Sequence, residues 1–325
     1  MHVQNSSLPA PALTNAGESS LWRKTISGKG AACALVCGSF RILHPGNLYC
    51  LKQAAEKFGN VCVVIDPEKN YPAETGGLLA LVRGAGAIAA PAQRKIKSVL
   101  QGLMPFTAVG CRDQEDMTEL SKAVREQAAE RHNIEPLENF FLADIAEAIR
   151  SGRTPLQVPA SACPDASCGK GRLEKLLSEL KGKKIVTVNG CFDILHSGHA
   201  RLLSEARRKG DALIVLVNDD DSVKAYKGPT RPVFPARFRI SVLNSLKPVT
   251  AAFPFSGNEP LEMLSLIRPA IHVKGGSFVE ERVRNEKRLV ERWGGRIEFV
   301  EMLGNYSTSN IIAGLNPDFL IRAEK

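Results

Sequence analysis

The segment that best predicts the fold of this chain reads Val186-Thr-Val-Asn-Gly-Cys-Phe-Asp-Ile-Leu-His-Ser-Gly-His199. Its apolar start is typical of a buried strand. A helix-like segment follows at 200–208, and a second apolar run follows at 212–217. Strand, helix and strand at this spacing predict a βαβ unit in a parallel sheet with right-handed crossovers.

Two histidines lie where this helix is expected to begin. His196 and His199 bracket Gly198, which lets a ligand come close to the backbone. Backbone N–H groups and the helix dipole favour an anion at such a position. Imidazoles there could donate hydrogen bonds to a phosphorus centre that gains charge in a transition state. The turn therefore predicts a phosphate site.

An earlier segment has the same pattern. It reads Ala34-Leu-Val-Cys-Gly-Ser-Phe-Arg-Ile-Leu-His-Pro-Gly-Asn47, and a helix-like segment at 48–58 and an apolar run at 61–65 follow it. A second similarity pairs Leu103–Ala108 with Leu246–Ala251. Two matches in the same order predict an internal duplication. We therefore expect an α/β protein of two Rossmann-like, doubly wound parallel-sheet domains.

Composition suggests where these domains begin and end. A polar start predicts a disordered tail, and a stretch rich in Pro, Ser, Ala and Gly predicts a linker. The expected parts are a tail at 1–30, a first α/β domain at 31–150 that is a degenerate copy, a linker at 151–180 and a second α/β domain at 181–325 that keeps the motifs.

The positive charge of the chain is concentrated in its second half. The 325 residues carry a net charge of +9. Residues 181–315 hold 21 Lys and Arg against 14 Asp and Glu, whereas residues 28–150 hold 14 of each. With aromatics at only 6%, this pattern favours a small phosphorylated ligand over a nucleic acid. We expect no membrane association, because no apolar run approaches about 18 residues, and we expect a cytoplasmic location.

Further cations follow the second predicted strand of this half. Asn218 ends that strand, and Lys224, Lys227 and Arg231 are spread over what reads as a Gly/Pro-rich loop. Ligands lie at the carboxyl ends of strands in open α/β sheets, so this loop could close over phosphates.

Two motifs near the C-terminus complete the candidate site. An apolar run ends in Lys274-Gly275-Gly276, which predicts a strand followed by a loop that contacts phosphate or base. Ser307, Thr308 and Ser309 lie at a predicted helix N-terminus. Their hydroxyls fit equally well as a helix cap and as ligands for the far end of a triphosphate.

Taken in order, these motifs resemble the nucleotidyltransferase superfamily that is marked by H-x-G-H and a Ser/Thr-rich C-terminal turn. The most similar branch is the heptose-1-phosphate adenylyltransferase domain of bacterial ADP-heptose synthases. The resemblance covers residues 181–315. It is carried by Asn-Gly-Cys-Phe-Asp-x-Leu-His-x-Gly-His, Val-Asn-x-Asp, Lys-Gly-x-x-Arg-Pro, Val-Lys-Gly-Gly and Ser-Thr-x-Asn-Ile-Ile.

The resemblance implies transfer of AMP from ATP, accompanied by Mg²⁺, to a sugar 1-phosphate, with D-glycero-D-manno-heptose 1-phosphate expected, in ADP-heptose synthesis for lipopolysaccharide. It implies no metal site made by the protein alone. The catalytic residues would be His196, His199 and Lys227. The nucleotide- and phosphate-binding residues would be Asn189, Gly190, Cys191, Phe192, Asp193, Gly198, Asn218, Lys224, Arg231, Arg239, Lys274, Gly275, Gly276, Ser307, Thr308 and Ser309.

Some positions depart from the family pattern, and other functions stay open. Ser277 replaces the Asp that often follows Lys-Gly-Gly, and Arg237 rivals Arg239 as the ligand of the triphosphate tail. One alternative is a cytidylyltransferase for glycerol 3-phosphate or an amino-alcohol phosphate. Another is a non-catalytic nucleotide-binding sensor.

The first half reads as a degenerate copy. It keeps His44 and Gly46, but Asn47 replaces the second histidine and Arg41 stands where the other copy has Asp193. Its net charge is zero and it lacks the Lys-Gly-x-x-Arg-Pro and Val-Lys-Gly-Gly motifs, so it has lost the electrostatics that a triphosphate site needs. We expect an inert domain that forms an internal pseudo-dimer with the second, with a homodimer as a further possibility. The alternative is a regulatory ligand site.

Overall fold

A computed structural model describes the second half of the chain almost continuously and the first half in pieces. It divides into two compact units, one of residues 1–144 together with 315–325 and one of residues 145–314, so the domain expected at 181–325 ends earlier than predicted. The described residues are 12–13, 20–21, 33–38, 45–65, 87–89, 100, 107–111, 124, 126–134, 147–148, 151, 154–157, 169–276, 280–301 and 308.

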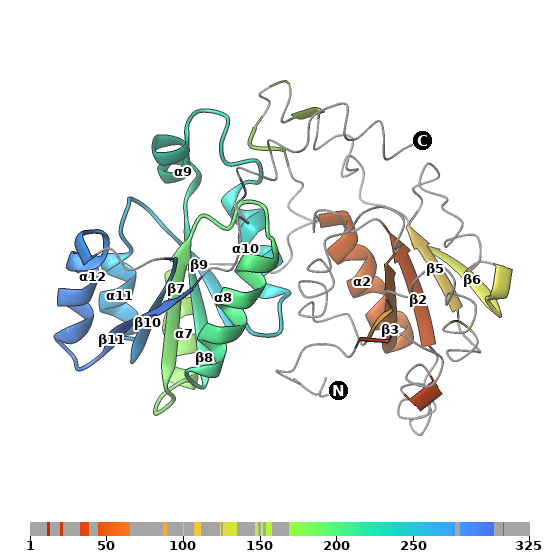
Figure 1. Cartoon of the computed structure of the whole chain (residues 1–325), viewed down its shortest axis with the longest axis horizontal. Helices are drawn as coiled ribbons and strands as arrows, with labels where there is room; N and C mark the ends of the chain where they lie inside the picture. Colours follow the sequence, from red (N-terminus) through yellow and green to blue (C-terminus); the bar gives the residue numbers. More distant parts are fainter. Residues whose placement is uncertain are drawn as a thin grey trace. The chain divides into compact units, whose positions relative to one another are not determined.

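The second unit is a parallel five-stranded sheet between two layers of helices. The strands lie in the order β11-β10-β7-β8-β9, and every pairing between neighbours is parallel. Figure 1 shows α11 and α12 on one side of this sheet and α8 and α10 on the other. The elements are α7 (Lys170–Glu179), β7 (Ile185–Gly190), α8 (Ser197–Arg208), β8 (Ala212–Asn218), α9 (Asp220–Lys227), α10 (Ala236–Asn244), β9 (Ala251–Phe255), α11 (Leu261–Ile267), β10 (Ile271–Gly275), α12 (Glu280–Glu291) and β11 (Arg296–Val300).

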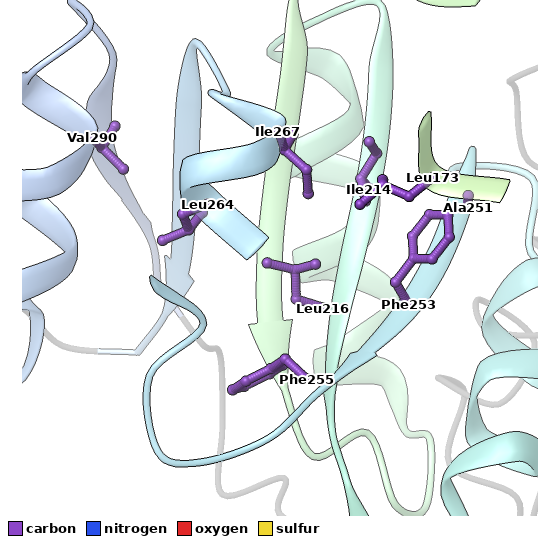
Figure 2. Close-up of a cluster of buried hydrophobic side chains, with 9 residues drawn as sticks. All are labelled: Leu173, Ile214, Leu216, Ala251, Phe253, Phe255, Leu264, Ile267 and Val290. Atoms are coloured by element: carbon purple, nitrogen blue, oxygen red, sulfur yellow. The ribbon is translucent and has the colours of Figure 1, made fainter. Parts of the chain in front are cut away.

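One core of this unit lies between β8, β9 and three helices. Ile214 and Leu216 on β8 and Phe253 on β9 point into it (Figure 2). They pack with Leu173 of α7 and Val290 of α12, each of them at most 3% exposed. Because residues i and i+2 of a strand share a face, this core fixes the register of β8. The register in turn places the carboxyl ends of β7 and β8 side by side.

The first unit is also a parallel sheet. Its strands lie in the order β1-β4-β3-β2-β5-β6. If β2 is numbered as strand 1 of its unit and β7 as strand 1 of the other, then β2 to β6 and β7 to β11 both lie in the order 3-2-1-4-5. In the first unit, β1 lies beyond β4. The α/β class and the parallel sheets are confirmed. The elements are β1 (Ala12–Leu13), β2 (Cys33–Gly38), α2 (Pro45–Phe58), β3 (Asn60–Ile65), β4 (Ala87–Ala89), β5 (Thr107–Cys111) and β6 (Glu130–Ile134).

One of the two sequence matches between the halves does not join equivalent strands, so this part of the prediction is wrong. The match of Leu103–Ala108 with Leu246–Ala251 would make β5 the counterpart of β9. However, β5 pairs with β2, the first strand of its sheet, whereas β9 pairs with β8, the second strand of its own. The strand that holds the position of β9 in the first sheet is β4, which pairs with β3. Short apolar segments after a proline resemble one another without being equivalent.

Two expected domain limits are also wrong. The tail predicted at 1–30 contributes β1, which pairs with β4 at the edge of the first sheet. The linker predicted at 151–180 belongs to the second unit. Within it, the backbone N–H of Leu156 donates to Val233 O, and α7 places Leu173 in the core. Apolar residues on one face of α7 outweigh the Pro- and Gly-rich composition around it.

In the described part of the chain, no helix is both long enough and apolar enough to cross a membrane.

Gly210 lets the turn after α8 lie against the start of β7. A Cβ there would lie 2.5 Å from the backbone oxygen of Lys184 and 2.6 Å from Cγ2 of Val186. We expect Gly210→Ala to lower the free energy of unfolding by about 1–3 kcal/mol, measured by urea denaturation. Gly171→Ala is the control, because nothing lies within 4 Å of its added Cβ. An equal effect of the two changes would contradict this account.

Candidate functional site

The H-x-G-H turn forms the start of α8. His196 is the residue before the first helical turn, and His199 is its third residue. The His196 backbone N–H donates to Nδ1 of His199 over 3.4 Å, and the ring centroids lie 3.8 Å apart. Because Nδ1 of His199 accepts, its proton in the neutral form resides on Nε2. The turn therefore holds His199 in the tautomer that can donate from Nε2.

Both rings are neutral near pH 7. Burial lowers the pKa of His196 to about 4. Burial, and then the neighbouring His196, lowers the pKa of His199 well below its usual value. Nδ1 of His196 is buried and makes no hydrogen bond to the described residues. A buried ring nitrogen without a partner is costly, so a ligand atom that paired with it would be favoured.

Stability should fall in mild acid because of this pair. A histidine whose pKa is lower in the folded state than in the unfolded state disfavours folding once the unfolded chain takes up the proton. The contribution of His196 to the free energy of unfolding is fully present above about pH 6.5. It is lost as the pH falls toward 4. The loss between pH 7.5 and 5 should be about 2 kcal/mol for this residue.

Urea denaturation at pH 7.5 and pH 5 measures this effect in the wild type and in His196→Asn. The variant should lose about 2 kcal/mol less than the wild type between the two pH values. The same pH dependence in both proteins would contradict the assignment.

Asp193 holds the loop that follows α9. Its carboxylate accepts from the backbone N–H groups of Val233 and Phe234 at 2.9 and 3.0 Å and from Nε of Arg231 at 2.7 Å. Asp193 is 3% exposed, so the ion pair is shielded from water. On the other side of the loop, Oγ1 of Thr154 donates to Thr230 O. Arg231 thus lies beside the H-x-G-H turn, but its charge is compensated by Asp193.

Arg239 corrects a sequence-based prediction. We expected a contact with the triphosphate tail, but its side chain is not exposed to solvent. It donates to Phe234 O at 2.9 Å, to Cys191 O, and to Oδ1 of Asp220 at 2.8 Å. Arg239 joins β7, α9 and the 231–234 loop. It therefore holds these elements of the site together and does not face a ligand.

The lysines after β8 lie on a helix, α9, and not on the loop that we expected. Asp219 caps this helix by accepting from the backbone N–H of Ser222 at 2.8 Å, and Gly228 ends it. Lys224 and Lys227 are exposed on its last turn. The helix presents both ammonium groups to solvent, where an anion can reach them.

Cys191 and its neighbours form the turn that leaves β7. Sγ of Cys191 lies 3.9 Å from Oδ1 of Asn218, and burial raises the pKa of this thiol. Phe192 has φ of 47° and packs its ring 5.2 Å from that of His199. A Cβ on Gly190 would lie 3.2 Å from the Phe192 ring. The predicted Asn-Gly-Cys-Phe-Asp segment is thus a tight turn that supports His199.

Lys274 and the two glycines after it lie at the carboxyl end of β10. Nζ of Lys274 donates to Oδ1 of Asn189, at the end of β7, over 2.8 Å. Gly275 is exposed, and Gly276 has φ of 108°, a conformation that glycine adopts without strain. The same lysine contacts Glu286, a residue that the sequence analysis did not single out.

The Ser/Thr turn is described at one residue. Oγ1 of Thr308 donates to the backbone oxygen of Ile194 over 3.2 Å, which brings it to the H-x-G-H turn. Ser307 and Ser309 lie outside the described residues.

The described residues contain no group of three or more His, Cys, Asp or Glu side chains that could hold a metal ion. Two carboxylates near the H-x-G-H turn, Asp193 and Asp220, already have partners. Asp193 accepts from Arg231, and Asp220 accepts from Arg239 and from the backbone of Ala236. These residues do not fit a metal held by the protein alone.

Comparison with known proteins finds similarity in the second half of the chain. Residues 187–314 match the cytidylyltransferase-like family. The bifunctional protein HldE of Syntrophotalea carbinolica is 42% identical over 132 residues, which cover 41% of this chain and 27% of that protein. HldE of Pectobacterium carotovorum is 39% identical over 191 residues, 54% of this chain and 40% of that protein.

The chain thus spans well under half the length of these curated relatives. A lipopolysaccharide core biosynthesis protein from Thermoplasma volcanium has a solved structure that is 26% identical, with a TM-score of 0.33. It covers 39% of this chain and 100% of its own.

Proposed function

We propose, from the cytidylyltransferase-like domain that residues 187–314 form, that this chain is a nucleotidyltransferase that transfers AMP from ATP to a sugar 1-phosphate. An oxygen of the sugar phosphate attacks the α-phosphorus of ATP. A new P–O bond forms, the bond to the β-phosphate breaks, and pyrophosphate leaves with the electron pair. Because the acceptor arrives as an anionic phosphate, the protein mainly has to position both substrates and offset their charge.

The observation that carries this proposal is the stacked pair of imidazoles at the start of α8. Nε2–H of His199 is held as a donor, and the buried Nδ1 of His196 makes no hydrogen bond to the described residues. The His199 donor can bond to an oxygen of an α-phosphate without a change of charge, and the stacked His196 ring holds it in place. As negative charge grows on that oxygen in the transition state, this hydrogen bond strengthens.

The exposed cations would bind the rest of the triphosphate. Lys224 and Lys227 are exposed on α9, and Thr308 contacts the turn at the backbone oxygen of Ile194. Arg231 is largely buried and its charge is compensated by Asp193, so it would contribute at most directed N–H groups at the end of its guanidinium and not an unpaired charge. Mg²⁺ would enter with ATP as part of the substrate, held by the phosphates.

The relatives favour a heptose phosphate as the acceptor, with ADP-heptose as the product for lipopolysaccharide synthesis. Two HldE proteins are about 40% identical over the part that matches. With ATP as its substrate, the chain would act in the cytoplasm.

The test is pyrophosphate release by the full chain with ATP or CTP. Acceptors are D-glycero-D-manno-heptose 1-phosphate as either anomer, glycerol 3-phosphate and phosphoethanolamine. Release with ATP and a heptose 1-phosphate supports the proposal. Release with CTP alone would make the chain a cytidylyltransferase, and no release with any pair would favour a nucleotide sensor.

We further infer that the two units arose by internal duplication and that the first is inert. The common 3-2-1-4-5 strand order supports this inference. So does the position of α2, which begins at Pro45, directly after His44, just as α8 begins directly after His196. The first unit would then form a pseudo-dimer with the second, and whole chains could pair further.

The stoichiometry of ATP binding tests whether the first unit is inert. Titration calorimetry of the full chain should give one ATP per chain, because the net positive charge and the phosphate-handling motifs lie in residues 181–315. The double variant His199→Ala/Lys227→Ala reports the second site. A second ATP per chain that persists unchanged in this variant would contradict the inference.

A further inference from the structure

Lys274 is paired with a buried carboxylate. Its Nζ donates to Oε1 of Glu286 over 3.0 Å and lies 2.8 Å from Oε2. Glu286, on α12, is 1% exposed, whereas the Lys274 side chain is 21% exposed. The carboxylate therefore lies inside the fold, and the ammonium lies between it and the edge of the sheet where ligands bind.

The pair carries no net charge. Burial raises the pKa of Glu286, and the Lys274 ammonium opposes this rise. The positive charge of the Lys274 ammonium and the negative charge of the Glu286 carboxylate sum to zero. An ammonium has three N–H groups. Lys274 donates one to Glu286 and one to Asn189, which leaves one for a ligand.

A second pair of buried side chains confines Glu286. Thr187 and His272 are opposite each other in β7 and β10, and Oγ1 of Thr187 lies 2.8 Å from Nδ1 of His272. Nε2 of His272 lies 3.8 Å from Oε2 of Glu286. Burial and the nearby Lys274 lower the pKa of His272 well below its usual value, so this ring adds no charge. Neither Nε2 of His272 nor Oε2 of Glu286 makes a hydrogen bond to the described residues. Lys274 is therefore the group that holds the carboxylate, and the neutral His272 ring packs beside it.

The location of Lys274 defines what it can reach. In the strand order β11-β10-β7-β8-β9, β7 and β10 are the adjacent strands at which the order reverses. Ligands of open α/β sheets bind at the carboxyl ends of such strands. The hydrogen bond from Lys274 to Asn189 spans this point.

We propose that Lys274 donates a hydrogen bond to an uncharged acceptor of a substrate and does not bind phosphate, and that Glu286 is the positioning residue that makes this possible. The acceptor is a carbonyl oxygen, ring nitrogen or hydroxyl oxygen, from the nucleoside or from the sugar. This inference rests on the proposed function and deepens it, because it separates Lys274 from the phosphate-binding lysines of α9.

The physical reason is the compensating carboxylate. A phosphate gains most from an unpaired cation, and Glu286 would repel it at short range. An uncharged acceptor has no such penalty and takes the directed N–H that the pair leaves available. Without Glu286, Lys274 would be a flexible, hydrated cation.

Equilibrium binding to the full chain separates the two kinds of ligand. Calorimetry compares ATP with tripolyphosphate, and D-glycero-D-manno-heptose 1-phosphate with inorganic phosphate. We expect Lys274→Met to weaken one intact substrate about tenfold, with both inorganic ions within about twofold of wild type. The substrate whose binding is weakened by Lys274→Met is the one that supplies the acceptor. Equal weakening of tripolyphosphate or phosphate, or no weakening of either intact substrate, would overturn the proposal.

A double-mutant cycle tests the part of Glu286. If Glu286 acts through Lys274, then Lys274→Met/Glu286→Gln should bind that substrate no more weakly than Lys274→Met alone. This pair variant also leaves no buried charge unpaired, so it guards against misfolding of the single variants. Glu291→Gln, on the exposed side of α12, should leave binding unchanged. Losses that multiply would show that Glu286 does not act through Lys274 and would overturn its role.

Failure of this inference differs from failure of the proposed function. A wild-type chain that binds neither ATP nor the sugar phosphate would overturn both. A wild-type chain that binds ATP, with variants that weaken ATP and tripolyphosphate alike, would overturn only the assignment of Lys274.

Discussion

His199→Ala is expected to lower kcat by about 10²–10³ while the Kd of ATP changes little. The reason is that Nε2–H of His199, fixed by the hydrogen bond from the His196 backbone to Nδ1, would act on charge that develops only in the transition state. Removing such a donor costs catalysis more than binding. Single-turnover rates and calorimetry with ATP measure the two effects separately.

His199→Gln is the matched variant, because its amide can place an N–H near the position of Nε2. It should recover part of the lost rate. Unchanged turnover in His199→Ala, or a loss that appears entirely as weaker ATP binding, would refute the role of this histidine.

Arg239→Met is expected to lower the free energy of unfolding by about 3–5 kcal/mol. Methionine fills part of the space but leaves the backbone oxygens of Cys191 and Phe234 without the donors that they have now. It also removes the partner of Asp220. Urea denaturation with circular dichroism measures the change.

Arg237→Met is the control, two residues earlier on the same helix and exposed. Its effect should stay within about 0.5 kcal/mol. If instead Arg239→Met were as stable as the control but bound tripolyphosphate far more weakly, Arg239 would be a phosphate ligand, as the sequence first suggested.

The turn at His196 could be predicted because its signals are local. A strand, a glycine and two histidines three residues apart lie within one short segment, and the structure places them at the start of α8 as expected. The predicted strand that ends at Lys274 is likewise present as β10. The family assignment of residues 187–314 confirms the resemblance that these motifs carried.

The helix α9 could have been recognised from the sequence. Asp219 and Gly228 are ordinary start and stop signals for a helix, and acidic residues fill its first turn. The charge and the Gly/Pro content around Lys224 and Lys227 favour a loop, but the start and stop signals that flank them outweigh that composition.

Glu286 and the partners of Arg239 were missed because their contacts join distant parts of the chain. Glu286 stands in a helix rich in charge, where one more glutamate is unremarkable in the sequence. One signal was present, however. Val283, Glu286 and Val290 share a helical face, and all three are at most 3% exposed. A glutamate within such a stripe predicts a buried carboxylate with a cationic partner.

The fate of the ATP phosphates tests the central claim most directly. The full chain is incubated with a heptose 1-phosphate and ATP labelled with ³²P in either the α or the γ position. The account predicts that the α label appears in the sugar nucleotide and the γ label in pyrophosphate. Transfer of the γ label to the sugar, or no transfer of either label, would contradict it.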